Sequence, residues 1–115
     1  MIKRKTQTII EQRENMRGGV GSVTLEHFFK PEELTAKSRL CAKLTLPPGA
    51  GIGLHQHEKE DEIYIILKGT GLLTDGSVET EVTAGDSILT GNGASHSIKN
   101  IGAGPLEMIA VIILY

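Results

Sequence analysis

Short runs of alternating apolar and polar residues, separated by glycine-rich turns, make up most of this chain. The run at residues 38–46 is the clearest, because aliphatic side chains occupy every second position from Leu40 to Leu46. Successive side chains of a strand point to opposite faces, so this run predicts a strand with one buried face. Further strands are predicted at residues 8–10, 20–29, 62–67, 72–73, 78–82, 87–90, 94–99 and 106–115. Roughly eight to ten short strands at this spacing predict an all-β antiparallel sandwich or barrel.

The predicted strand at residues 62–67 is apolar on both faces. If Glu62 points inward, Tyr64 lies on the same inner face. The outer row then consists of Ile63, Ile65 and Leu67. An outward apolar row needs cover from a second sheet or from another subunit, so we predict a homodimer.

Composition and charge exclude several classes of function. The chain of 115 residues is long enough for one domain with its own core, and its net charge of −2 provides no electrostatic footprint for nucleic acid or an anionic membrane. The single cysteine, Cys41, has no partner for an internal disulfide. The N-terminus shows no signal-peptide pattern, so we expect a cytoplasmic protein. The most apolar segment, residues 106–115, is too short to cross a bilayer as a helix.

The first part of the chain has a weaker pattern. Residues 1–17 carry a small excess of basic side chains, and we expect an N-terminal arm there and a barrel domain at residues 18–115. The segment 17–21 contains three glycines. A phosphate-binding loop would need a preceding strand, a following helix and usually a lysine, so these glycines instead predict a turn.

A candidate metal site lies in residues 49–62. His55 and His57 are two positions apart and would project from one face of a strand. Glu62 can lie opposite them if the chain turns at residues 58–61 and begins a second, neighbouring strand. Two imidazoles and a carboxylate suit a divalent transition metal better than Ca²⁺ or Mg²⁺. His27 has no partner at ligand spacing and is interpreted as a surface or packed histidine.

Two spaced motifs in this region resemble those of the cupins, a family of small jelly-roll β-barrels. The first family motif, G-x5-H-x-H-x(3,4)-E-x6-G, is matched by Gly49, His55, His57, Glu62 and Gly69. The second motif, G-x5-P-x-G-x2-H-x3-N, is matched by Gly85, Gly93, His96 and Asn100, with Gly91 in place of the proline. The replaced residue belongs to a turn and is not a ligand position, so it affects the rigidity of that turn.

The resemblance implies a single-domain cupin β-barrel that holds one divalent metal ion per chain, with Mn, Fe, Ni or Zn as the candidates. The implied ligands are His55, His57, Glu62 and His96. Asp61 would also satisfy the variable spacing of the first motif, but the distance to Gly69 and the strand parity with Tyr64 select Glu62. Cupins of this size commonly pair through a sheet face and often exchange an N-terminal strand, which is consistent with the predicted homodimer and arm.

The family resemblance leaves the activity open. One hypothesis is a metal-dependent enzyme acting on a small oxygen-rich metabolite, of the dioxygenase, decarboxylase or isomerase type, loosely similar to the bacterial oxalate-decarboxylase-like group. The alternative is a metal- or small-ligand-binding module that senses or carries without turnover. A sugar-nucleotide epimerase is disfavoured, because that chemistry needs no three-histidine metal site.

Candidate substrate contacts are fewer. Tyr64 is expected to point inward and to bind substrate, although a core aromatic with its hydroxyl satisfied is an equal alternative. Glu26, Arg39 and Glu107 are further candidates, and the sequence does not select among them.

Overall fold

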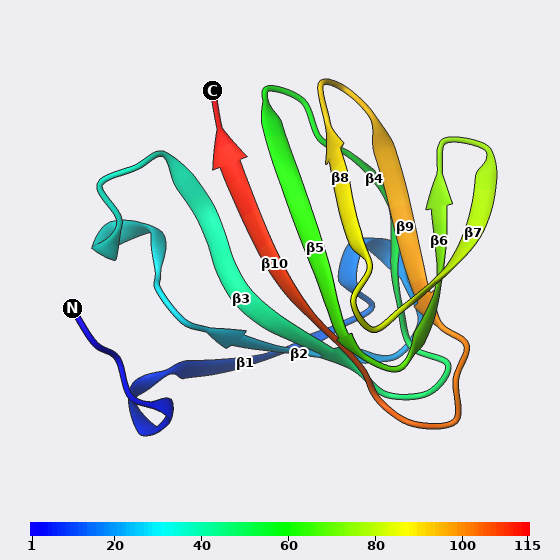
Figure 1. The fold of residues 1–115 in the computed structure, drawn as a ribbon, viewed down its shortest axis with the longest axis horizontal. Coiled ribbons are helices and arrows are strands. Elements are labelled where there is room, and N and C mark those ends of the chain that lie inside the picture. Colours follow the sequence, from blue (N-terminus) through cyan, green and yellow to red (C-terminus); the bar gives the residue numbers. More distant parts are fainter.

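The computed structural model describes residues 1–115 as two antiparallel sheets that face each other (Figure 1). The strands are β1 (Ile9–Glu14), β2 (Ser22–His27), β3 (Ser38–Leu46), β4 (Gly51–Gln56), β5 (Glu60–Lys68), β6 (Thr70–Asp75), β7 (Val78–Thr83), β8 (Ser87–Gly91), β9 (Ser95–Asn100) and β10 (Leu106–Leu114). Three single 3₁₀ turns complete the fold: η1 (Lys5–Gln7), η2 (Met16–Gly18) and η3 (Pro31–Glu33). The all-β, jelly-roll prediction is confirmed.

The two sheets differ in width. One sheet has six strands in the order β1-β2-β3-β10-β5-β8, and the other has four in the order β4-β9-β6-β7. The alternating pattern of β3 buries its aliphatic face, and Leu44 pairs directly with Met108 of β10. Both side chains are completely buried in the core between the sheets. The widely spaced apolar positions of the sequence therefore meet in a single core.

Two loops show how local residue chemistry sets the strand ends. β6 and β7 form a hairpin in which Asp75 pairs with Val78, and Gly76 has a φ of 65° that suits glycine. β2 is shorter than the predicted strand at 20–29, because Gly21 has a φ of 81° and interrupts the extended backbone. Val20 consequently lies outside the sheet and is exposed.

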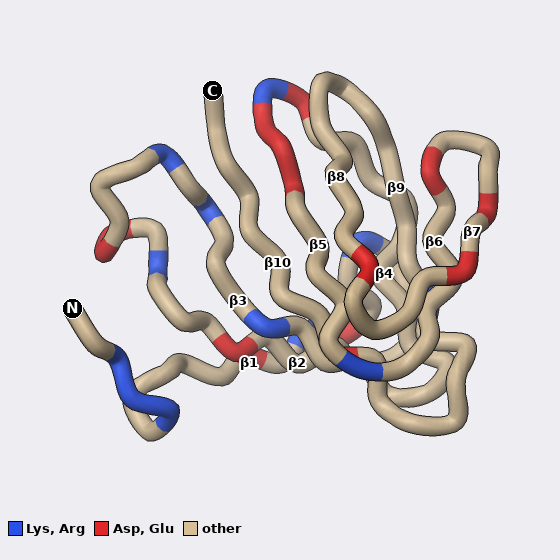
Figure 2. Tube along the Cα trace, in the orientation of Figure 1, with Lys and Arg blue, Asp and Glu red and all other residues tan.

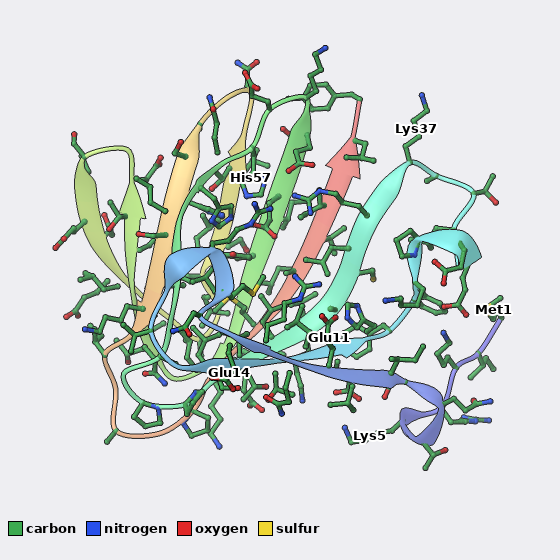
Figure 3. All side chains as sticks on the ribbon, turned by 180° about the vertical axis from the view of Figure 1, so that it is seen from behind. Met1, Lys5, Glu11, Glu14, Lys37 and His57 are labelled. Atoms are coloured by element: carbon green, nitrogen blue, oxygen red, sulfur yellow. The ribbon has the colours of Figure 1, made fainter.

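The N-terminal segment is part of the larger sheet. Residues 9–14 of the predicted arm form β1, which pairs with β2 of the same chain along its whole length and ends the six-stranded sheet. The turn between β1 and β2 contains η2 and lies against β4 (Figure 3). Through this contact the turn between β1 and β2 reaches the four-stranded sheet.

The outer face of the six-stranded sheet is apolar at its centre. Ile65 and Leu67 of β5 are 40% and 48% exposed, as expected for an outward row. Ile65 pairs with Ile109 of β10, and Ile63 pairs with Val111, so the row extends across two strands. None of the helical segments is long and apolar enough to cross a membrane.

Candidate metal centre

Four side chains meet between the two sheets. His55 comes from β4, His57 from the turn after β4, His96 from β9 and Glu62 from β5. Their candidate donor atoms all lie within 4.8 Å of one another. We expected the histidine pair and Glu62 on neighbouring strands, but β4 and β5 belong to different sheets. The histidines therefore face Glu62 across the space between the sheets.

A tight turn produces this crossing. Lys59 has a φ of 56°, which reverses the chain within a few residues. Strand β5 therefore begins at Glu60, two residues earlier than the sequence pattern predicted. The backbone of His57 is fixed by two hydrogen bonds of 2.9 Å: its N–H donates to the carbonyl of Ala94, and its own carbonyl accepts from the N–H of Gly93. The ligand turn is thus joined to the turn that precedes His96.

The donor atoms have the spacing of ligands around one ion. His96 Nε2 lies 3.0 Å from His57 Nε2 and 3.1 Å from His55 Nε2. Glu62 Oε1 lies 2.9 Å from His96 Nε2 and 3.0 Å from His57 Nε2. Two ligands at right angles, with metal–ligand bonds of about 2.1 Å, are about 3.0 Å apart. The cluster therefore fits one divalent transition metal.

The hydrogen bonds behind the rings orient the lone pairs inward. His55 Nδ1 lies 2.7 Å from the carbonyl oxygen of Gly53, and His57 Nδ1 lies 2.7 Å from Glu60 Oε1. Both partners are acceptors, so each Nδ1 donates its proton and each Nε2 presents a lone pair to the cluster. Glu62 Oε1 is buried and makes no well-directed hydrogen bond. The protein provides no hydrogen-bond donor for these converging lone pairs, and a bound cation would provide their missing partner.

The charges of the centre follow from burial and mutual contact. Burial opposes ionisation of Glu62, but the imidazoles of His55 and His96 lower its pKa to about 2. Burial lowers the pKa of His96, which favours the neutral, ligating imidazole. Burial also raises the pKa of Tyr64 well above its ordinary value, and the adjacent Glu62 adds to the rise. Tyr64 is therefore a neutral phenol, stacked on the His96 ring with 5.0 Å between centroids.

Sequence reasoning missed Glu60, which supports His57 from behind. Arg39 donates two hydrogen bonds of 2.7 and 2.6 Å to the Glu60 carboxylate, which also accepts from His57. The hydrogen bonds from Arg39 are the main reason that the pKa of Glu60 is lowered to about 2. Glu60 and Glu62 point to the same face of β5. A sequence prediction that began β5 at residue 60 would therefore have placed Glu60 on the inner face.

The structure also separates the three further candidates. Arg39 is linked to the centre through Glu60. Glu26 and Glu107 instead flank Lys43 at 3.6 and 3.7 Å, away from the donors. Figure 2 shows acidic residues gathered where β5 begins. Only Arg39 of the three therefore acts near the predicted ligands.

A pocket of about 120 Å³ opens onto the centre. The donors that line it are His55, His57 and Glu62, beside Tyr64 and the buried His27. Four cationic side chains complete its wall, namely Arg13, Arg17, Lys30 and Arg39, and Glu62 is its single acid. A larger cavity of about 280 Å³ lies against the four-stranded sheet, and none of the donors lines it. The smaller pocket is therefore the route to the centre, and its two cations without an ion pair, Arg17 and Lys30, favour anions.

Comparisons with known proteins agree with this geometry. The model of the cupin domain family matches residues 42–112, which include the four donor residues. The oxalate-binding protein of Thermotoga maritima is 46% identical over 114 residues, covering 99% of this chain and 94% of that protein. An uncharacterized protein of Methanocaldococcus jannaschii is 40% identical over 89 residues, covering 77% of this chain and 70% of that one. The crystal structure of a predicted oxalate decarboxylase from Thermotoga maritima gives a TM-score of 0.94 at 45% identity, covering 100% of both chains.

Proposed function

Because the chain belongs to the cupin domain family, we propose that it binds a small chelating dicarboxylate, with oxalate as the simplest, at a divalent transition metal. The proposed ligands are His55, His57, Glu62 and His96. Manganese, iron, nickel and zinc all suit this mixed nitrogen and oxygen set. Four protein ligands leave about two positions of an octahedral ion for the two oxygens of a chelating anion.

The cationic pocket carries this proposal. A space of about 120 Å³ admits only a small molecule. Arg13 is paired with Glu11 and Arg39 with Glu60, so the positive charge of the wall comes from Arg17 and Lys30. The name of the relative from Thermotoga maritima, an oxalate-binding protein at 46% identity, points to the same class of ligand. Tyr64 is the proposed aromatic wall of the pocket, beside His96.

Catalysis is the second candidate, and it rests on His27. This imidazole lines the pocket, and its Nε2 lies 2.7 Å from Glu11 Oε1. A histidine whose ring is held by a carboxylate is a suitable group for proton transfer to or from a substrate. A metal-dependent enzyme of the decarboxylase, dioxygenase or isomerase type would use such a group. Binding without turnover is favoured, because Glu62 is the single carboxylate that lines the pocket and it belongs to the proposed ligand set. The pocket therefore has no second carboxylate to act as a catalytic acid or base.

Calorimetric titration of the Mn²⁺-loaded protein with oxalate tests the proposal. We expect one oxalate per chain, no binding to the metal-free protein, and acetate binding at least about tenfold weaker, because acetate has one carboxylate and makes fewer charge-assisted hydrogen bonds. Equal affinities for oxalate and acetate, or undiminished oxalate binding without metal, would contradict it. Carbon dioxide or formate released from oxalate during the titration would favour the enzyme.

We further propose that two copies pair through the outer apolar row, in the cytoplasm. Light scattering at micromolar concentration should give twice the chain mass of 12.4 kDa. The variant Ile65→Lys should shift the protein to the monomer mass, since it places a charge at the centre of the exposed row. A wild-type protein with the mass of one chain would refute the dimer.

A further inference from the structure

The four cations of the pocket are not equivalent. Arg13 donates to Glu11 at 2.6 and 3.3 Å, and Arg39 is held by Glu60. The side chains of Arg17 and Lys30 form no ion pair and line the same pocket. Arg17 has the planar, forked donor that matches a carboxylate in two places, whereas Lys30 offers a compact point charge. Arg17 is therefore the free group best suited to an oxoanion.

The backbone of Arg17 is held in an uncommon conformation. Its φ of 54° and ψ of 30° lie in the left-handed region, and Asn15 has a φ of 49°. Such conformations persist where the surrounding structure determines them, and they concentrate at ligand-binding sites. Here the Gly18 N–H donates to the Asn15 carbonyl at 2.9 Å, and the Asn15 side chain donates to the Gly19 carbonyl at 3.0 Å. The turn is thus closed around Arg17.

Glycines seat this turn on β4, the strand that carries His55. The Gly51 N–H donates to the Val20 carbonyl at 2.8 Å. A Cβ on Gly19 would clash with the Gly51 carbonyl, and a Cβ on Gly53 would clash with the Arg17 carbonyl. These close approaches are available only to glycine. In Figure 3 the turn lies across β4 near His57.

Arg17 belongs to the wall of the pocket that opens onto the centre. Tyr64, His55 and Glu62 line the pocket together with Arg17. Arg17 therefore lies beside the opening to the centre, on the side where the outer oxygens of a chelating anion would project.

We propose that Arg17 is the specificity-determining residue for dicarboxylates, binding the outer oxygens of an anion whose inner oxygens face the four-donor centre. This inference rests on the proposed function. A monocarboxylate such as acetate presents fewer oxygens to the guanidinium and gains little from it. The glycine-seated turn supplies the position of the guanidinium, because it joins β1 and β2 directly to β4.

The test is calorimetric titration of Mn²⁺-loaded Arg17→Gln with oxalate and, separately, with acetate. We expect oxalate affinity to fall about 10- to 100-fold, since a charged hydrogen-bonding partner is lost, and acetate affinity to change much less. Metal content per chain should stay at the wild-type value. Lys68→Gln, which removes the same charge from an exposed position outside the pocket, should bind both anions like the wild type.

The outcomes separate the two proposals. If the wild type does not bind oxalate, the proposed function fails and this inference fails with it. If the wild type binds oxalate and Arg17→Gln binds it equally well, only the role of Arg17 is overturned. An equal loss of oxalate and acetate affinity would show general electrostatic attraction and would likewise overturn the specificity role.

A second variant pair tests the seating of the turn without touching its charge. Gly19→Ala forces the turn away from Gly51, so oxalate affinity should fall while metal content is retained. Gly104→Ala adds the same methyl group where no atom lies within 4 Å, and it should leave oxalate affinity unchanged. Full oxalate affinity in a folded Gly19→Ala protein would show that the position of the turn is irrelevant to binding.

Discussion

Replacement of His57 by Ala is expected to reduce the metal content of the purified protein from about one ion per chain to nearly none. His57 is 1% exposed, and its Nε2 lies 3.0 Å from both His96 Nε2 and Glu62 Oε1. Loss of a direct ligand should exceed the roughly 10- to 100-fold effect of losing a partner behind a ligand. Elemental analysis after dialysis against a defined Mn²⁺ buffer measures the change.

His27→Ala is the matched control for this experiment. His27 is also buried, but it belongs to β2 and lies outside the four-residue cluster. Its removal should leave the metal content at the wild-type value. Equal metal content in His57→Ala and the wild type would mean that the ion is held elsewhere, and a folded wild type that takes up no metal would exclude the centre.

Replacement of Glu60 by Gln is expected to weaken metal binding about 10- to 100-fold while the fold is retained. The carboxylate accepts from His57 Nδ1–H and from two donors of Arg39. An amide has only one acceptor oxygen, so its NH₂ group must face one of the three donors. It also carries no charge, so the hydrogen bond that orients the His57 ring becomes weaker. Competition with a chelator of known affinity gives the change in dissociation constant.

Glu58→Gln provides the comparison with equal loss of charge. Glu58 is exposed and lies two residues from Glu60, outside the hydrogen bonds of the centre. Its replacement should change metal affinity only through the weak, screened attraction of a surface charge. If Glu58→Gln and Glu60→Gln weaken binding equally, the effect comes from net charge, and the orienting role of Glu60 is wrong.

Much of the fold and the membership of the cluster could be predicted from the sequence. The alternation in β3 and the inward position of Glu62 and Tyr64 are local properties of a pleated strand, and the structure has them as expected. The motif spacings also named the four residues that the fold brings together. Such alternating patterns are informative because a shift of one residue would turn every side chain of a strand to the opposite face of the sheet.

The remaining features depend on backbone geometry that side-chain patterns do not encode. Glu60 was missed because Lys59 turns the chain in a left-handed conformation, which is uncommon for lysine, and so lets β5 begin early. The facing arrangement of β4 and β5 is a property of the sheet order. Arg17 was part of a segment interpreted only as a turn, and its approach to the pocket requires the distant contact of that turn with β4.

The division of the donors between the sheets has a mechanical consequence. Three imidazoles are attached to the four-stranded layer or its loops, and the carboxylate is attached to the six-stranded layer. An ion bound by all four side chains would link the two sheets to each other beside the pocket. The free energy of metal binding would then stabilise the folded protein against separation of the two sheets. Binding of the metal ion would make the walls of the pocket more rigid. Metal binding would therefore preorganise the pocket for the anion that binds next.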